Sequence, residues 1–225
     1  ARHLDAEGAA RLGPDELHDP ARDREIINLE LALSDLQHVE RRLQKIEKQA
    51  RVGEKEAIAE LDLLQRIHAL LSAGQPARKV EPKNEDEQRL LRTYNLLTAK
   101  RELYVANVAE SDLPQADNRL VAQLREAIAA DAEPASVVPL SARIESELIE
   151  LEPGERSACL VELGLTGPGL LSLIRGGYSL LDLISYFTAG EKEVRAWTIR
   201  RGTKAPQAAA EIHTDFERGF IRAET

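Results

Sequence analysis

Apolar residues recur at helical spacing along an N-terminal stretch that runs from Asp19 to about Ala73. The first stripe, between Asp19-Pro20 and Gly53, advances in steps of three and four residues and predicts a long amphipathic helix. Its members are Ile26, Leu29, Leu33, Leu36, Val39, Leu43 and Ile46. Asp19 suits the N-cap and Pro20 the first helical position, so the helix is expected to begin there and to close at Gly53.

A second apolar stripe follows Gly53 after a short turn and predicts a second helix. It contains Ile58, Leu61, Leu64, either Ile67 or His68, and Leu71. Two amphipathic helices joined by a short turn form an antiparallel coiled-coil hairpin. A proline-containing loop comes next, and "EDEQRLLRTYNLLTAK" reads as a short helix with acidic residues at its start. We therefore predict a helical domain over residues 19–98.

The periodicity changes beyond that domain. "ELYVANV" is rich in β-branched and aromatic residues and predicts a strand, "QADNRLVAQLREAIAADA" predicts an amphipathic helix, and "SVVPLSARIESEL" a second strand that ends at residues 141–143. Strand, helix and strand at this spacing form a parallel βαβ unit, in which ligands bind beyond the carboxyl ends of the strands. Residues 107–110 and 141–143 are therefore expected to be neighbours at one sheet edge.

The last residues, 185–225, predict a small sheet. "SYFTA" and "EVRAWTI" alternate like two strands of a hairpin, "RRGT" forms a turn, and "KAPQAAAEIH" has Pro206 placed for a first helical turn. "GFIRAE" is expected to be a further strand. A hairpin, a helix and a third strand make the first half of a β-grasp fold. Trp197 is expected to lie in the core of this sheet or to be half-buried in it, and in a nucleic-acid reader it could instead stack on a base.

Composition limits the class of protein. The chain has 225 residues and a net charge of −9, which argues against a general nucleic-acid coat but leaves room for local basic surfaces. The single cysteine, Cys159, cannot form an internal disulfide and fits a reducing cytosol. No apolar run is long enough for a membrane span, and the first residues carry no secretory signal. We expect a cytoplasmic monomer without a membrane partner.

One group of candidate functional residues consists of basic side chains that could bind a polyanion, and no catalytic group is among them. The far end of the first helix carries Arg41, Arg42, Lys45 and Lys48, and the C-terminal sheet carries Arg195, Arg200, Arg201 and Lys204. These sets are expected to face a polyanion. No catalytic acid–base pair and no His or Cys at metal-ligand spacing is visible, so neither catalytic nor metal residues are predicted. Asp35 and Glu40 read as solvated charges, and His213 as structural or part of a partner surface.

The two polar edges resemble the base-reading motifs of P-loop GTPases, an Asn-Lys-x-Asp after one strand and a Ser-Ala-Lys after the next. Here they read Asn107-Val108-Ala109-Glu110 and Ser141-Ala142-Arg143. An Asp carboxylate accepts from two adjacent donors of guanine, whereas adenine has a ring acceptor there. The longer Glu110 moves the carboxylate away and relaxes the demand for guanine. "YVAN" followed by this Glu resembles the YchF subfamily of Obg-like ATPases, which prefer ATP.

The resemblance extends over residues 19–225 and leaves 1–18 unmatched. Residues 19–98 look like the family's helical insertion, and "LISYFTAGEKEVRAWTIRRGTKAPQAAAEIHTDFERGFIRAE" looks like the start of its TGS domain, 185–225. It implies an α/β fold. Residues 99–184 would form the second half of a P-loop NTPase domain that carries the coiled-coil insertion, and an incomplete β-grasp TGS domain would follow. It further implies ATP as the nucleotide and a ribosome or ribosomal RNA partner.

The sequence departs from the family in lacking its pair of phosphate and magnesium motifs, G-x-x-x-x-G-K-[S/T] followed by D-x-x-G. The chain alone is therefore expected to be inactive as an ATPase, and Mg²⁺ is expected only in a complete protein. Three functions stay open: part of a YchF-type ATPase, a non-catalytic ribosome- or RNA-binding module made of a helical hairpin and a TGS domain, or an unrelated coiled-coil adaptor. The motif "EVRAWTIRRGTKAPQAA" disfavours the third.

Overall fold

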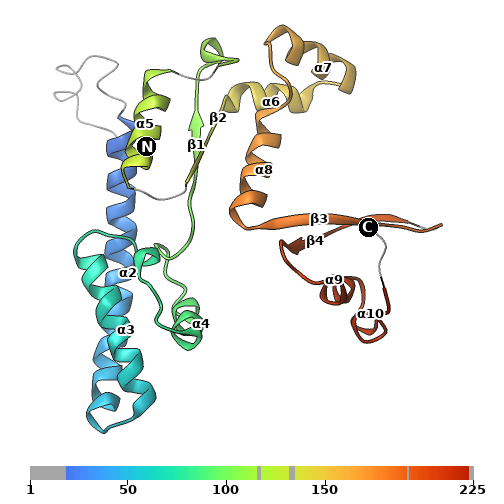
Figure 1. Ribbon diagram of the computed structural model, residues 1–225. Helices are drawn as coiled ribbons and strands as arrows, with labels where there is room; N and C mark the ends of the chain where they lie inside the picture. Colours follow the sequence, from blue (N-terminus) through green and yellow to red (C-terminus); the bar gives the residue numbers. More distant parts are fainter. Residues whose placement is uncertain (1–18, 116–117, 132–134, 192, 223–225) are drawn as a thin grey trace, which may run out of the picture. The chain divides into compact units, whose positions relative to one another are not determined.

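A computed structural model describes residues 19–115, 118–131, 135–191 and 193–222 (Figure 1). These residues divide into two compact units. The first contains the described residues up to Arg101 together with helix α5 (Arg119–Ala130), and the second contains residues 102–115 and those from Ser136 onward. Among the described residues, none of the helices combines the length and the apolar character that crossing a bilayer requires.

The first unit is built on a helical hairpin of α2 (Pro20–Arg51) and α3 (Lys55–Ser72), as the periodicity predicts. The Asp19 side chain accepts hydrogen bonds from the N–H groups of Ala21 and Arg22 at 3.1 and 3.0 Å, which confirms the predicted cap. Gly53, in the turn between the helices, has φ of +89°, a left-handed conformation that suits glycine.

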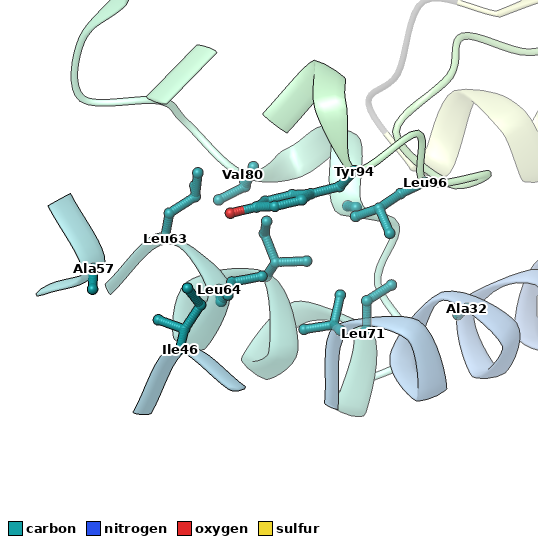
Figure 2. Close-up of a cluster of buried hydrophobic side chains, with 12 residues drawn as sticks. Ala32, Ile46, Ala57, Leu63, Leu64, Leu71, Val80, Tyr94 and Leu96 are labelled. Atoms are coloured by element: carbon teal, nitrogen blue, oxygen red, sulfur yellow. The ribbon is translucent and has the colours of Figure 1, made fainter. Parts of the chain in front are cut away.

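The core of this unit lies between the hairpin and the segments that follow it. Leu63, Leu64 and Ile67 of α3 are fully buried, and Val39 of α2 packs in the same cluster. Figure 2 shows the α3 side chains beneath Val80, Tyr94 and Leu96, which come from beyond the hairpin. A short 3-10 turn, η1 (Ala77–Lys79), directly precedes Val80, and helix α4 (Glu85–Thr93) lies between Val80 and Tyr94 in the chain.

The N-terminal half of the predicted α2 stripe is not buried, which corrects the sequence interpretation. Ile26, Leu29 and Leu33 are 41%, 51% and 49% exposed. The buried side chains in this half belong instead to Arg24, Ala32 and Asp35. A different face of α2 is buried here because α5 packs against this half of the helix. That face carries the small Ala32 and two polar side chains, Arg24 and Asp35, which form hydrogen bonds with other segments.

Asp35 was expected to be a solvated charge and is instead a buried anchor. Its side chain is only 4% exposed. One carboxylate oxygen accepts the N–H of Leu97 at 2.9 Å, and the other accepts both the N–H and the hydroxyl of Thr98 at 2.7 Å. The Thr98 hydroxyl also accepts the N–H of Ala77 at 3.0 Å. Asp35 therefore ties the segment that leads out of the helical unit to α2.

Ion pairs join the hairpin to α4. The Arg66 guanidinium contacts the Glu87 carboxylate at 2.5 Å, and the same carboxylate accepts the Lys83 backbone N–H at 2.8 Å. Burial acts to raise the pKa of Glu87, but the hydrogen bond from Lys83 and the pairing with Arg66 outweigh it and lower the pKa below its ordinary value. The ionised pair thus helps to hold α4 on α3.

The second unit contains the predicted parallel strand pair, β1 (Leu103–Asn107) and β2 (Ser136–Leu140), registered from Leu103 opposite Ser136 to Asn107 opposite Leu140. Asn118 caps α5, the connecting helix, through a 3.0 Å bond to Val121 N–H. The βαβ order is confirmed. The second strand was expected to reach residues 141–143, but it ends at Leu140 and helix α6 (Ala142–Glu150) begins at once.

The rest of the second unit is α7 (Pro153–Glu162), α8 (Gly169–Leu180), β3 (Leu183–Ala189), β4 (Val194–Arg200), α9 (Ala205–Ile212) and α10 (Thr214–Arg218). β3 and β4 form the predicted antiparallel hairpin. The third strand predicted in "GFIRAE" is wrong for its described part: residues 219–222 pair with no strand among the described residues, and Ile221 is exposed. An extended segment becomes a strand only when its backbone has a partner.

Candidate nucleotide base site

The register of the parallel pair brings the two predicted motifs to one sheet edge. Asn107 and Leu140 are the last residues of β1 and β2 and lie opposite each other. The chain continues from them into 108–110 and 141–143 at the same end of the strands, as the sequence predicts. The Val108 N–H donates to the Leu140 carbonyl at 2.9 Å and prolongs the pairing by one residue.

The central contact of this edge joins the two motifs. The Asn107 side-chain oxygen accepts the backbone N–H of Ala142 at 2.9 Å. Ala142 is the first residue of α6, and the N–H groups of a first helical turn have no partner within their own helix. This bond uses the amide oxygen only, so the amide –NH₂ of Asn107 remains available as a donor. Both residues are exposed, so a ligand can reach this donor.

Val108 and Ser141, also predicted at the site, are buried residues of the edge. Val108 is 7% exposed and Ser141 is 4% exposed. Ser141 is the N-cap residue of α6, and its carbonyl accepts the Glu145 N–H at 3.0 Å. They therefore offer little surface to a ligand, and the exposed residues of the two motifs include Asn107, Ala142 and the two charged residues.

Those charged residues are Glu110 and Arg143, both exposed. Glu110 begins a short 3-10 turn, η2 (Glu110–Asp112), and Arg143 lies in the first turn of α6. The Arg143 guanidinium donates to Glu147 at 3.0 Å. That hydrogen bond, the charge of Glu147 and then the charge of Glu110 raise the pKa of Arg143. The carboxylate of Glu110 thus acts on the same edge that Asn107 and Ala142 form.

Glu145 is a residue that sequence reasoning missed. Its carboxylate accepts the N–H of Gly169 at 2.6 Å through Oε1 and the N–H of Leu170 at 3.1 Å through Oε2. These partners begin α8, more than twenty positions along the chain. A single acidic residue on a helical pattern carries no local signal for such a distant partner, so only the folded chain reveals it.

All four residues of the first basic set, on α2, are exposed, and one of them is held in an ion pair. Arg42 forms a bidentate pair with Glu60 at 2.6 and 3.0 Å, which neutralises its charge locally. The hydrogen bond to Glu60 raises the pKa of Arg42. Arg42 therefore joins α2 to α3, while its side chain is 44% exposed and its role in a polyanion surface stays a prediction.

The second basic set belongs to the other unit. Arg200 ends β4, and Arg201 and Lys204 follow it as exposed residues. The Arg195 guanidinium lies 4.2 Å from the centroid of the Trp197 ring, a cation–π contact. Trp197 is half-buried, as predicted, and its indole N–H donates to Thr188 at 2.9 Å. His213 accepts the N–H of Asp215 at 3.2 Å and caps α10, which matches the structural interpretation of this residue.

Comparison with known proteins identifies relatives over most of the chain. The chain is 48% identical over 208 residues to the Ribosome-binding ATPase YchF of Bacillus subtilis, covering 92% of this chain and 56% of that protein. It is 40% identical to Obg-like ATPase 1 of Rattus norvegicus over 92% of this chain and 52% of that protein. The family model YchF-GTPase_C, described as "Protein of unknown function (DUF933)", matches residues 183–225.

The fold agrees with these sequence matches. The chain superposes on the structure of the Schizosaccharomyces pombe YchF GTPase with a TM-score of 0.79 at 33% identity, covering 95% of this chain and 57% of that one. The names of these proteins differ in the nucleotide that they state, ATP or GTP. The chain spans about half the length of the curated relatives it matches. On this evidence the chain belongs to the YchF family of Obg-like ATPases.

Proposed function

We propose that this chain supplies the base-reading edge of a YchF-type ATPase and that the edge selects adenine. The observation that carries the proposal is the bond from Ala142 N–H to the Asn107 side-chain oxygen, which joins the two motifs and does not use the Asn107 –NH₂. A purine offers ring nitrogen acceptors to such a donor. Exposed Glu110 lies at the same edge, where the position of its carboxylate decides whether it accepts hydrogen bonds from the base.

The choice between purines rests on Glu110. Guanine presents its ring N–H and its amine side by side, and a correctly placed carboxylate accepts both. Adenine presents an acceptor nitrogen at the matching position, and a carboxylate there would face its lone pair. A glutamate side chain is one methylene longer than aspartate, so its carboxylate need not occupy that position. The longer side chain of Glu110 therefore favours ATP as the nucleotide.

Hydrolysis needs parts that the sequence of this chain lacks. Phosphoryl transfer depends on a phosphate-binding loop and Mg²⁺ for positioning and charge stabilisation. No phosphate-binding loop motif occurs in the 225 residues. The string Asp5-Ala6-Glu7-Gly8 matches D-x-x-G in letters, but it lies outside both the described residues and the region of resemblance. We therefore assign no residue here to Mg²⁺ or to catalysis.

The nucleotide prediction can be tested on the chain itself. Titration with ATP is expected to shift the NMR signals of the Asn107 side-chain amide and the Ala142 amide. The dissociation constant is expected in the millimolar range, because the chain has no phosphate-binding loop motif to bind the phosphates. The same sample is expected to release no phosphate above background. Shifts confined to residues away from 107–110 and 141–143 would contradict the base site, and turnover by the purified chain would contradict the inactive state.

A ribosome is the partner that we propose for the two basic sets. Curated relatives are named ribosome-binding ATPases, and exposed Arg41, Lys45 and Lys48 lie on α2 while Arg200 and Arg201 follow one another in the other unit. With a net charge of −9, binding would arise from these local fields and weaken steeply with salt. The non-catalytic alternative, an RNA-binding module of helical hairpin and TGS domain, uses the same surfaces without nucleotide.

Co-sedimentation with ribosomes over a salt series tests this partner. Two double variants, Arg41→Glu with Lys45→Glu and Arg200→Glu with Arg201→Glu, are each expected to reduce the pelleted fraction at low salt. The control is Arg22→Glu with Arg119→Glu, which changes the net charge equally at two first helical turns where glutamate is tolerated. If all three variants pellet alike, the basic sets are only solvated surface. Insensitivity to ATP would favour the non-catalytic module.

A further inference from the structure

The start of α8 contacts two residues that flank the base segment 141–143 in the chain, Leu140 before it and Glu145 after it. On one side, the Glu145 carboxylate accepts the N–H groups of Gly169 and Leu170. On the other, Leu140 approaches Gly169 so closely that a Cβ added to Gly169 would lie 2.7 Å from the Leu140 Cβ. The same added atom would lie 2.9 Å from the Glu145 oxygen. Only a glycine permits α8 to pack at this distance.

These two contacts bracket the residues that meet the nucleotide. Leu140 directly precedes Ser141 and pairs with Asn107, and Glu145 follows Arg143 within the first turns of α6. The hydrogen bond from Glu145 N–H to the Ser141 carbonyl is internal to α6 and cannot fix where the helix lies. The carboxylate bonds to α8 can, because they join α6 to a different element.

We propose that Glu145 is a positioning residue for the base site. By binding the start of α8, it holds the first turn of α6 at the distance at which Ala142 N–H meets the Asn107 oxygen. That bond uses the Asn107 oxygen only and leaves its –NH₂ available as a donor. A carboxylate with two backbone N–H groups at a helix start gains from charge-assisted hydrogen bonds and from the helix dipole. The proposal rests on the proposed function in one respect: it takes Asn107 and Ala142 as the base-reading groups.

A simpler role for Glu145 is a cap that stabilises α8 alone. The two roles differ in what happens at Ala142, which lies on the other helix. Ala142 is exposed, and its N–H is expected to be protected from solvent exchange by its bond to Asn107. Loss of a cap would expose the Gly169 and Leu170 amides only. Loss of a positioning residue would also loosen the Ala142 bond.

Amide exchange measured by NMR on the nucleotide-free 225-residue chain separates these roles. Glu145→Ala is expected to speed exchange at Ala142 about tenfold, the change that corresponds to losing roughly 1.4 kcal/mol of local protection. Glu145→Gln keeps one acceptor oxygen and is expected to have a smaller effect. Gly169→Ala is expected to act like Glu145→Ala, because the new methyl pushes α8 away. The control Glu150→Ala alters an exposed residue at the other end of α6 and should change neither amide.

Unchanged exchange at Ala142 in Glu145→Ala, with faster exchange at Gly169 and Leu170, would overturn the proposal and leave a cap. Should Glu145→Ala fail to fold, Glu145→Gln and Gly169→Ala decide the same question. ATP titration of the same samples forms a second arm, in which affinity is expected to fall several-fold for Glu145→Ala. If ATP leaves Asn107 of the parent chain unshifted, the base site fails as a function, while the exchange rates still decide whether Glu145 holds Ala142.

Discussion

Replacing Asp35 with alanine is expected to lower the free energy of unfolding of the helical unit by about 3 kcal/mol, because three hydrogen bonds to a buried carboxylate are lost together. The donors are the N–H groups of Leu97 and Thr98 and the Thr98 hydroxyl. They would remain buried without an acceptor, and an unpaired buried donor is more destabilising than a bond that was never formed. Asp35→Asn is expected to be similarly harmful, because its –NH₂ would face the same donors.

Urea unfolding followed by amide exchange in α3 measures this effect on the helical unit. The matched control is Glu40→Ala, since Glu40 is an exposed acidic residue on the same helix and sequence reasoning gave both residues the same role. We expect Glu40→Ala to change the free energy of unfolding by less than about 0.5 kcal/mol. Equal effects of the two substitutions would show that Asp35 is no anchor.

Leu64→Ala is expected to destabilise the helical unit by about 3 kcal/mol, within the range typical of large-to-small changes at fully buried positions. Leu64 is 0% exposed and lies in the cluster between α3 and the covering segments. Leu29→Ala removes the same atoms from a side chain that is 51% exposed, and it is expected to cost less than about 1 kcal/mol. The pair is compared by the same unfolding measurement. A large effect at Leu29 would mean that the exposed half of the α2 stripe is covered in solution.

The elements that depend on neighbouring residues could be predicted from the sequence. Asp19 caps α2, Gly53 closes the turn, and Leu64, Ile67 and Leu71 of the predicted α3 stripe are buried, because each feature is set within a few positions of the chain. Ile58, at the start of the same stripe, is 50% exposed, which corrects that part of the prediction. The parallel strands are also confirmed, since strand, helix and strand at short spacing allow few arrangements. The same logic predicted that Asn107 and Ala142 would meet at one edge.

The features that failed depend on distant partners. In the sequence, Asp35 resembles any acidic residue on a helix, because its partner Thr98 lies 63 positions away in the chain. The stripe of Ile26, Leu29 and Leu33 obeys helical spacing, yet the packing of α5 buries the neighbouring face of α2. The ion pair of Arg42 with Glu60, on the other helix of the hairpin, likewise has no local signal in the sequence, although the polyanion role of Arg42 stays a prediction. In each case the sequence pattern predicted the helix correctly, but contacts with distant segments decided which of its side chains are buried or paired.

The base preference of the chain tests the central claim most directly. Dissociation constants for ATP and GTP would be measured by NMR at the Asn107 and Ala142 amides, for the parent chain, Glu110→Asp and the uncharged control Glu110→Gln. The account predicts that the parent prefers ATP, that Glu110→Asp shifts the ratio toward GTP by about tenfold, as one well-placed pair of hydrogen bonds to a base can, and that Glu110→Gln produces no gain for GTP. An identical ATP-to-GTP ratio in the parent and in Glu110→Asp would contradict the assignment of this edge as the base-reading site.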